Sequence, residues 1–192
     1  MFSIASPTFL TEALADIRKR TEYLKVTTKR MKITTEFIEI LMEQALLEAQ
    51  KGETSGEVPV GAVIAVNGEI IARAHNEVEM RRDASAHAEI LAMREASRVL
   101  ENWRLKEAVL CVTLEPCTMC IGALRLARVP TVVFGAEDPR LGALGSLYDL
   151  SIDDRVGPLP HVIRGIQARK CKGLLSKFFE KRRTTDTQRV LH

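Results

Sequence analysis

The chain has 192 residues, of which 46% are hydrophobic and 28% are charged, and its formal net charge is +3. These values suit a single globular domain with a sizeable core, and no apolar run approaches the roughly 18 residues that a membrane-spanning helix needs. Four cysteines at uneven spacing do not look like a disulfide framework, so a reducing, cytoplasmic location is the expectation.

Residues 1–32 stand apart from the rest, because a regular hydrophobic pattern begins only after Met31. The segment does not have the form of a secretory signal, and its three acidic residues argue against a transit peptide. It is basic, with seven Lys and Arg against three Asp and Glu. We expect a peripheral extension at 1–32, or a chain whose physiological start is Met31.

Hydrophobic periodicity divides residues 33–183 into helices and strands. Asn67-Gly68, between two short apolar runs, is the strongest short-range signal for a β-hairpin. The expected elements are a helix at about 35–51, strands at 60–66 and 70–74, a helix at 86–100, a strand at 109–113, a helix at about 118–128, strands at 131–134 and 162–165, and a last helix that includes 169–182.

After the hairpin, helices alternate with strands, which predicts an α/β fold with a central sheet covered by helices on both faces. We therefore expect a three-layer α/β/α domain over residues 33–183. Glycine, proline and aspartate between about 136 and 160 predict a long loop with one helical turn. Residues 184–192 are short and polar, and we expect a flexible tail.

Cys117 and Cys120 lie three positions apart, after a proline and a predicted strand. They could form half of a metal site, a redox pair or two packed thiols. Thirty residues earlier, His87 begins the motif His-Ala-Glu at the start of a predicted helix. Catalytic zinc sites use three protein ligands and leave the fourth position open. The combined pattern matches the motif of zinc deaminases that act on bases and nucleosides, so we expect zinc at His87, Cys117 and Cys120.

The chemistry of this set is consistent with that role. A helix N-terminus favours thiolates at Cys117 and Cys120, and zinc would lower the pKa of a water at the open position towards about 7. Glu89 lies two residues from His87, so the two side chains are not on the same helix face, and Glu89 could instead carry a proton. A thioredoxin-type pair would not need His-x-Glu upstream. Cys111 and Cys171 lie on apolar faces and are expected in the core.

Beyond these motifs, residues 33–183 resemble the bacterial tRNA-specific adenosine deaminase family (TadA) of the cytidine deaminase-like superfamily. The zinc motif alone would also fit cytidine, guanine, deoxycytidylate or riboflavin-pathway deaminases, and the segment 132–150 narrows the resemblance. The matching segments are EVPVGAV (57–63), the asparagine after the second strand (Asn76), AHAEI (86–90), VTLEPCTMC (112–120), VVFGAEDPRLGALGSLYDL (132–150) and LLSKFF (174–179).

The resemblance implies the cytidine deaminase-like fold with a mixed central sheet of about five strands. It also implies zinc-dependent hydrolytic deamination of adenosine to inosine at the wobble position of the tRNA anticodon loop. One zinc would bind each subunit of a homodimer, with Glu89 as the proton shuttle. By matched position, the residues near the substrate are Val58, Pro59, Asn76, Ala88 and Asp138.

Several of these residues have simpler readings. Asn76 follows a strand and Asp138 precedes a proline, so both could be turn residues. The outer face of the last helix is a candidate surface for RNA phosphates, or a solvated face, at Lys177, Lys181, Arg182 and Arg183. Two other functions remain open. One is a zinc deaminase of free bases or nucleosides such as guanine, cytosine or cytidine. The other is a non-enzymatic RNA-binding module with a structural zinc, against which the lack of a fourth protein ligand argues.

Overall fold

The computed structural model describes residues 33–190, so the expected extension at 1–32 lies outside the described residues. In this part of the chain, helices and strands follow in the predicted order. The elements are α2 (Thr35–Thr54), β1 (Gly61–Val66), β2 (Glu69–His75), α3 (Val78–Arg81), α4 (Ala88–Val99), β3 (Ala108–Leu114), α5 (Thr118–Leu126), β4 (Thr131–Ala136), a 3₁₀ turn (Asp154–Val156), β5 (His161–Ile163) and α6 (Ala168–Val190).

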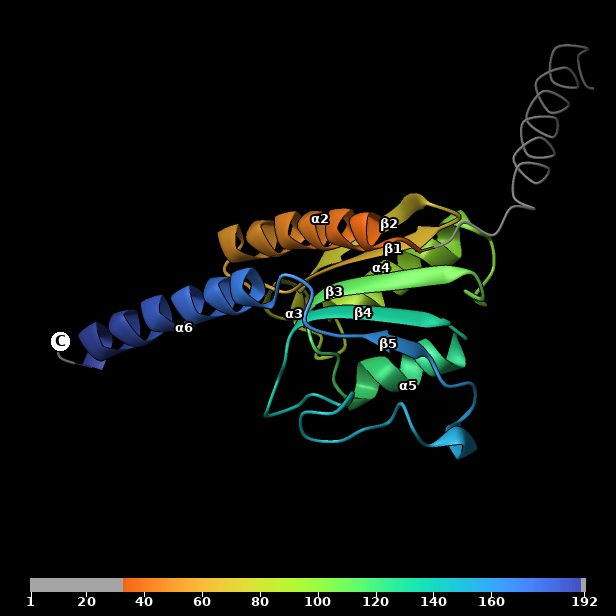
Figure 1. Cartoon of the computed structure of the whole chain (residues 1–192). Helices are drawn as coiled ribbons and strands as arrows, with labels where there is room; N and C mark the ends of the chain where they lie inside the picture. The colour runs from red at the N-terminus through yellow and green to blue at the C-terminus, as the bar shows by residue number, and fades with distance from the viewer. Residues whose placement is uncertain (1–32, 191–192) are drawn as a thin grey trace, which may run out of the picture. The chain divides into compact units, whose positions relative to one another are not determined.

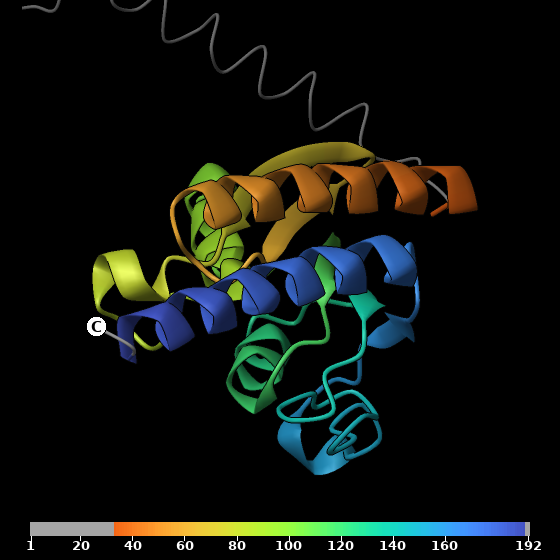
Figure 2. The same ribbon diagram turned by 90° about the vertical axis from the view of Figure 1, so that its left-hand side faces the viewer.

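The strands of this part form one sheet in the order β2-β1-β3-β4-β5 (Figure 1). Strand β1 is antiparallel to both β2 and β3, whereas β3, β4 and β5 run parallel. Helices α4 and α5 pack on one face, and α2 and α6 lie side by side on the other (Figure 2). The predicted three-layer α/β/α fold with a mixed sheet is therefore confirmed.

Local sequence explains the best-defined parts of the fold. Asn67 and Gly68 both have positive φ, 52° and 86°, as a tight hairpin turn between β1 and β2 requires. Every residue of β1 and β4 is buried, which is typical of inner strands covered on both faces. A Cβ on Gly61 would lie 2.0 Å from the carbonyl oxygen of Ala45, so only glycine lets α2 approach β1 this closely.

Three details differ from the expectations. The short helix α3 was not predicted, because four residues are too few to show a period. Helix α4 begins at Ala88 rather than at 86. Helix α6 continues over 184–190 to Val190, where the sequence predicts a flexible tail; no glycine or proline interrupts it there. No helix within residues 33–190 is long and apolar enough to cross a membrane.

The topology brings the predicted site residues to one edge of the sheet. Because β1 is antiparallel to its two neighbours, its first residue lies at the same edge as the last residues of β2 and β3. The parallel strand β4 also ends there. Helices α4 and α5 both begin at this edge, with His87 and Cys117 as their N-cap residues.

Candidate active site

Three predicted zinc ligands lie together at the N-termini of α4 and α5. Nδ1 of His87 is 3.7 Å from Sγ of Cys117 and 3.5 Å from Sγ of Cys120. The three possible ligand atoms all lie within 4.8 Å of one another. His87 and the half-buried Cys117 line the floor of a pocket, and Cys120 is fully buried.

The spacing of these atoms fits a tetrahedral zinc ion. With Zn–S bonds of about 2.3 Å and Zn–N bonds of about 2.0 Å, tetrahedral angles put sulfur and nitrogen about 3.6 Å apart. The two measured separations agree with this value, and two sulfurs with one imidazole are a donor set that zinc prefers. The residues present therefore fit a zinc ion with one open position.

Protonation at these side chains is tightly coupled. The hydrogen bond from Cys120 and the contact with His87 lower the pKa of the Cys117 thiol to about 4. The pKa of Cys120 is raised, because it is the donor to Cys117 and is buried. The hydrogen bond with Cys117 raises the pKa of His87. One thiolate is thus favoured even before a metal ion displaces the shared proton.

Glu89 lies in the first turn of α4 and lines the pocket above the ligands. Its side chain is only 4% exposed, and burial raises the pKa of the carboxyl group. A buried carboxyl group with a raised pKa keeps its proton at higher pH than an exposed one does. Its role as a proton carrier stays a prediction.

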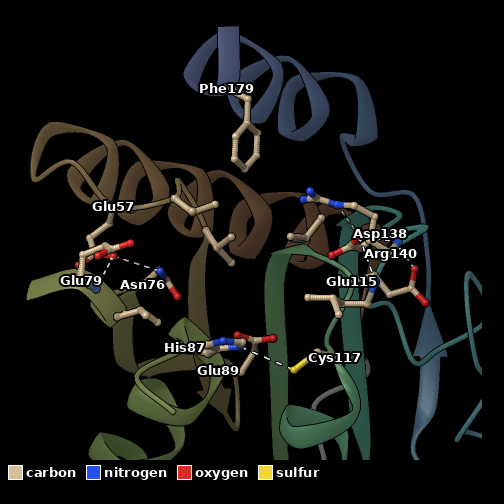
Figure 3. Close-up of a pocket in the computed structure, with 15 residues that line it drawn as sticks. Glu57, Asn76, Glu79, His87, Glu89, Glu115, Cys117, Asp138, Arg140 and Phe179 are labelled. Carbon is tan, nitrogen blue, oxygen red and sulfur yellow. Dashed lines mark hydrogen bonds and ion pairs between the residues drawn. The ribbon is translucent and has the colours of Figure 1, made fainter. Parts of the chain in front are cut away.

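A pocket of about 260 Å³ opens above this floor (Figure 3). It is lined by predicted residues from different elements, Val58 before β1, Asn76 after β2 and Asp138 after β4. The structure thus brings these three side chains together with His87 and Glu89. Their roles towards a substrate stay predictions.

Two predicted substrate contacts lie elsewhere. Pro59 is buried, and its neighbours Val58 and Val60 line the pocket in its place. Ala88 is fully buried, and its side chain packs in the core beneath α4. Neither side chain is among the residues that line the pocket in the described structure. Both have small or apolar side chains that the core accepts, so a role for them would have to come from the backbone.

Comparisons with known proteins agree with this geometry. Residues 35–136 match the family model described as the cytidine and deoxycytidylate deaminase zinc-binding region. The tRNA-specific adenosine deaminase of Bacillus subtilis is 50% identical over 145 residues, which are 76% of this chain and 90% of that protein. The chain belongs to the tRNA-specific adenosine deaminase family.

Solved structures place the family within a wider group. One structure, from a study of A-to-I editing by tRNA:A34 deaminases at the wobble position of transfer RNA, matches with a TM-score of 0.69 and 39% identity. It covers 70% of this chain and 98% of that chain. Guanine deaminase from Bacillus subtilis matches with a TM-score of 0.50 and 40% identity, over 52% of this chain and 64% of the other.

The structure adds pocket residues that the sequence reasoning for this deaminase missed. Among them are the buried carboxylates of Glu57 and Glu115 and the side chains of Arg140, Leu141 and Phe179. Glu115 had a local signal, since an acidic residue between a buried strand and Pro-Cys needs partners at the sheet edge. Phe179 had none, because helical spacing assigned it to the apolar face of α6.

Asp138 illustrates how a turn residue can also face the pocket. Its Oδ1 accepts hydrogen bonds from the backbone amides of Arg140 (2.9 Å) and Leu141 (3.3 Å). This is the turn role that the sequence allowed. Arg140 in turn lies 5.7 Å from the ring centre of Phe179, so the turn connects the pocket to helix α6.

Proposed function

We propose that this protein hydrolyses adenosine to inosine at the wobble position of the tRNA anticodon loop. The observation that carries the proposal is the His87, Cys117 and Cys120 donor set next to the buried Glu89, in one pocket. In a chain 50% identical to a tRNA-specific adenosine deaminase, this pocket supports the same reaction. Water replaces the amino group of adenosine, and ammonia is released.

We assign the residues as follows. His87, Cys117 and Cys120 would hold one zinc ion per subunit, and zinc would supply the Lewis acidity that makes water nucleophilic near neutral pH. Glu89 would take the proton of the attacking water, deliver it to the purine ring and assist the departing amine. Asn76, with Val58 and Asp138, would hold the nucleotide that has been turned into the pocket.

The tRNA partner is supported by a second hollow that shares Arg140 and Phe179 with the pocket. This hollow, of about 330 Å³, is lined by Arg140, Lys172, Leu175, Ser176, Phe179 and Arg183. At the shared border, the ring of Phe179 suits stacking with a base of a single strand, and the cation of Arg140 suits its phosphate. We propose that the loop nucleotides beside the target lie here.

The face of α6 predicted to bind RNA is already partly engaged. Nζ of Lys181 lies 3.3 Å from a carboxylate oxygen of Glu53, and Arg182 lies 5.4 Å from the ring centre of Phe178. An exposed ion pair of this kind contributes little, so Lys181 can exchange Glu53 for a phosphate. The hollow and this face of α6 together carry cationic side chains that could contact several phosphates of the RNA.

We also propose a cytoplasmic homodimer. Large apolar side chains are exposed at α5 and in the loop beside it, with Leu126 at 73%, Tyr148 at 59% and Ile152 at 74%. Arg125 joins the two segments through a hydrogen bond to the carbonyl of Leu150. Exposed apolar groups that lie on adjoining segments favour a subunit interface. Light scattering should give twice the chain mass, and Leu126→Glu should give the monomer.

The experiment that tests the function compares substrate classes. The zinc-loaded protein is given an anticodon stem-loop with adenosine at the wobble position, the same stem-loop with adenosine one position away, free guanine, free cytosine and cytidine. Inosine in the first substrate alone supports the proposal. Ammonia from a free base or nucleoside, with no inosine in either stem-loop, would identify a small-molecule deaminase instead.

A further inference from the structure

Glu57 is a buried carboxylate on the pocket wall. The sequence motifs give its side chain no role. It is 1% exposed and lies four positions before β1. Oε2 accepts a hydrogen bond from Nδ2 of Asn76 at 3.2 Å (Figure 3). Its carboxylate also accepts from the backbone amides of Glu79 (3.2 Å) and Met80 (2.7 Å).

The carboxylate of Glu57 decides how the Asn76 amide is oriented. A carboxylate can only accept hydrogen bonds, so it fixes which end of the Asn76 amide faces it. The NH₂ group must point towards Glu57, and the carbonyl oxygen points away from it (Figure 3). Asn76 is 8% exposed and lines the pocket, so the orientation of its amide determines what the pocket offers to a nucleotide.

Backbone hydrogen bonds hold the Glu57 carboxylate in position. Among the described residues, no Lys or Arg side chain forms an ion pair with Glu57. Two backbone amides and one side-chain amide therefore satisfy a buried charge. The backbone amides are fixed by the fold, so they hold the carboxylate in one position. The carboxylate in turn restricts the rotation of the Asn76 side chain through its hydrogen bond.

We propose that Glu57 is a positioning residue, which locks the Asn76 amide with its carbonyl oxygen free to accept a hydrogen bond from the target nucleotide. This inference rests on the proposed function only for the identity of the nucleotide. The orientation itself follows from the carboxylate and its three donors. Glu57 acts through Asn76, and its removal should matter only while Asn76 is present.

A double-mutant cycle tests this dependence. The variants are Glu57→Gln, Asn76→Ala and the pair, each measured for zinc content, kcat and KM with the stem-loop. Glu57→Gln presents an NH₂ group to a donor, so we expect kcat/KM to fall about 10- to 100-fold. Added to Asn76→Ala, the same change should lower kcat/KM less than about 2-fold, within the usual error of additivity. Independent, additive losses would overturn the proposal.

The matched control is Glu79→Gln. Glu79 is exposed on the same pocket wall, and its backbone amide, not its carboxylate, contacts Glu57. The change removes a negative charge from the pocket but keeps the three donors. We expect a smaller loss of kcat/KM than in Glu57→Gln, because the hydrogen bond between Glu57 and Asn76 is kept. A loss equal to that of Glu57→Gln would attribute the effect to charge rather than to positioning and contradict the proposal.

A measurement without substrate separates this inference from the proposed function. In ¹⁵N-labelled protein, the side-chain NH₂ signal of Asn76 is assigned by its absence in Asn76→Ala. We expect one strongly downfield proton, because a charged acceptor holds it, and the loss of that shift in Glu57→Gln. If Glu57→Gln does not fold, Glu57→Asp keeps the charge but withdraws it by one methylene, and the shift should fall there too. An unchanged signal would overturn the proposal even if the enzyme makes inosine.

Discussion

Oε1 of Glu115 accepts a hydrogen bond from the backbone amide of Leu144, 2.8 Å away and 29 positions further along the chain. The same carboxylate accepts from the amide of Asp138 at 3.1 Å and from Ser146. A Cβ on Gly142 would lie 2.5 Å from this carboxylate, so the loop needs a glycine there. Glu115 thus ties the loop at 138–146 to the end of β3, two positions before Cys117.

Glu115→Gln should loosen this loop without removing the metal site. Its new NH₂ group would face backbone donors, and a buried hydrogen bond to a charged group contributes about 1.5–3 kcal/mol. We expect faster hydrogen exchange at the amides of Leu144 and Ser146, a loss of about 10-fold or more in kcat/KM, and unchanged zinc content. Glu137→Gln, at an exposed neighbour, is the control and should change neither. Unaltered exchange in Glu115→Gln would contradict the role.

The zinc ligands can be tested by metal content alone. Cys117→Ala removes one of three donors, so zinc affinity should fall by more than the roughly 10- to 100-fold that follows loss of an outer hydrogen-bond partner. Cys111→Ala is the matched control, since Cys111 is buried in the core on the opposite face. It should keep about one zinc per chain, measured by atomic absorption. Full zinc content in Cys117→Ala would refute the assignment.

Arg125 is a buried cation with an unusual set of partners. Its guanidinium donates to the carbonyl oxygens of Leu150, Asp153 and Gly157, so it holds the loop against α5. Arg125→Met would remove the buried donor of three partly buried hydrogen bonds, and we expect a loss of about 1–3 kcal/mol in the free energy of unfolding. Urea denaturation measures this, with the exposed Arg94→Met as the control. Equal stability of both variants would mean that water replaces the guanidinium.

The proposed RNA hollow predicts a salt effect. Lys172→Ala should weaken stem-loop binding at any sequence and reduce the slope of log affinity against log salt by about 1, since one phosphate contact is lost. Fluorescence anisotropy over a range of salt concentrations measures both. Lys106→Ala is the control, because this exposed lysine precedes β3, at the opposite edge of the sheet from the pocket. An identical slope in Lys172→Ala would exclude the hollow as a phosphate site.

The fold could be predicted from the sequence where a pattern repeats. Helical spacing from Phe37 onwards indicated α2, and Asn67-Gly68 indicated the hairpin, because each signal is local. The prediction of a flexible tail after Arg183 was wrong over 184–190, since a polar composition indicates exposure rather than disorder. A polar helix end carries no apolar period that would extend the prediction.

The site could be predicted only in part, because only some of its residues belong to a local sequence motif. His87, Glu89, Cys117 and Cys120 have chemistry that few other patterns share, so their motif was enough to bring them together. Glu57 acts through backbone groups that are distant in sequence, and no spacing encodes such partners. Phe179 reaches the pocket because α6 crosses the sheet edge, which depends on packing rather than on local sequence.

The most direct test of the account measures inosine at the wobble position in bulk tRNA, by sequencing for A-to-G changes. The zinc-loaded protein is compared with Glu89→Gln, which keeps the three ligands and the side-chain volume but has no proton to carry. We predict inosine confined to the wobble position, and its loss by at least about 100-fold in the variant, with zinc content and unfolding temperature unchanged. Equal inosine formation by the two proteins, or none by a zinc-loaded protein, would contradict the account.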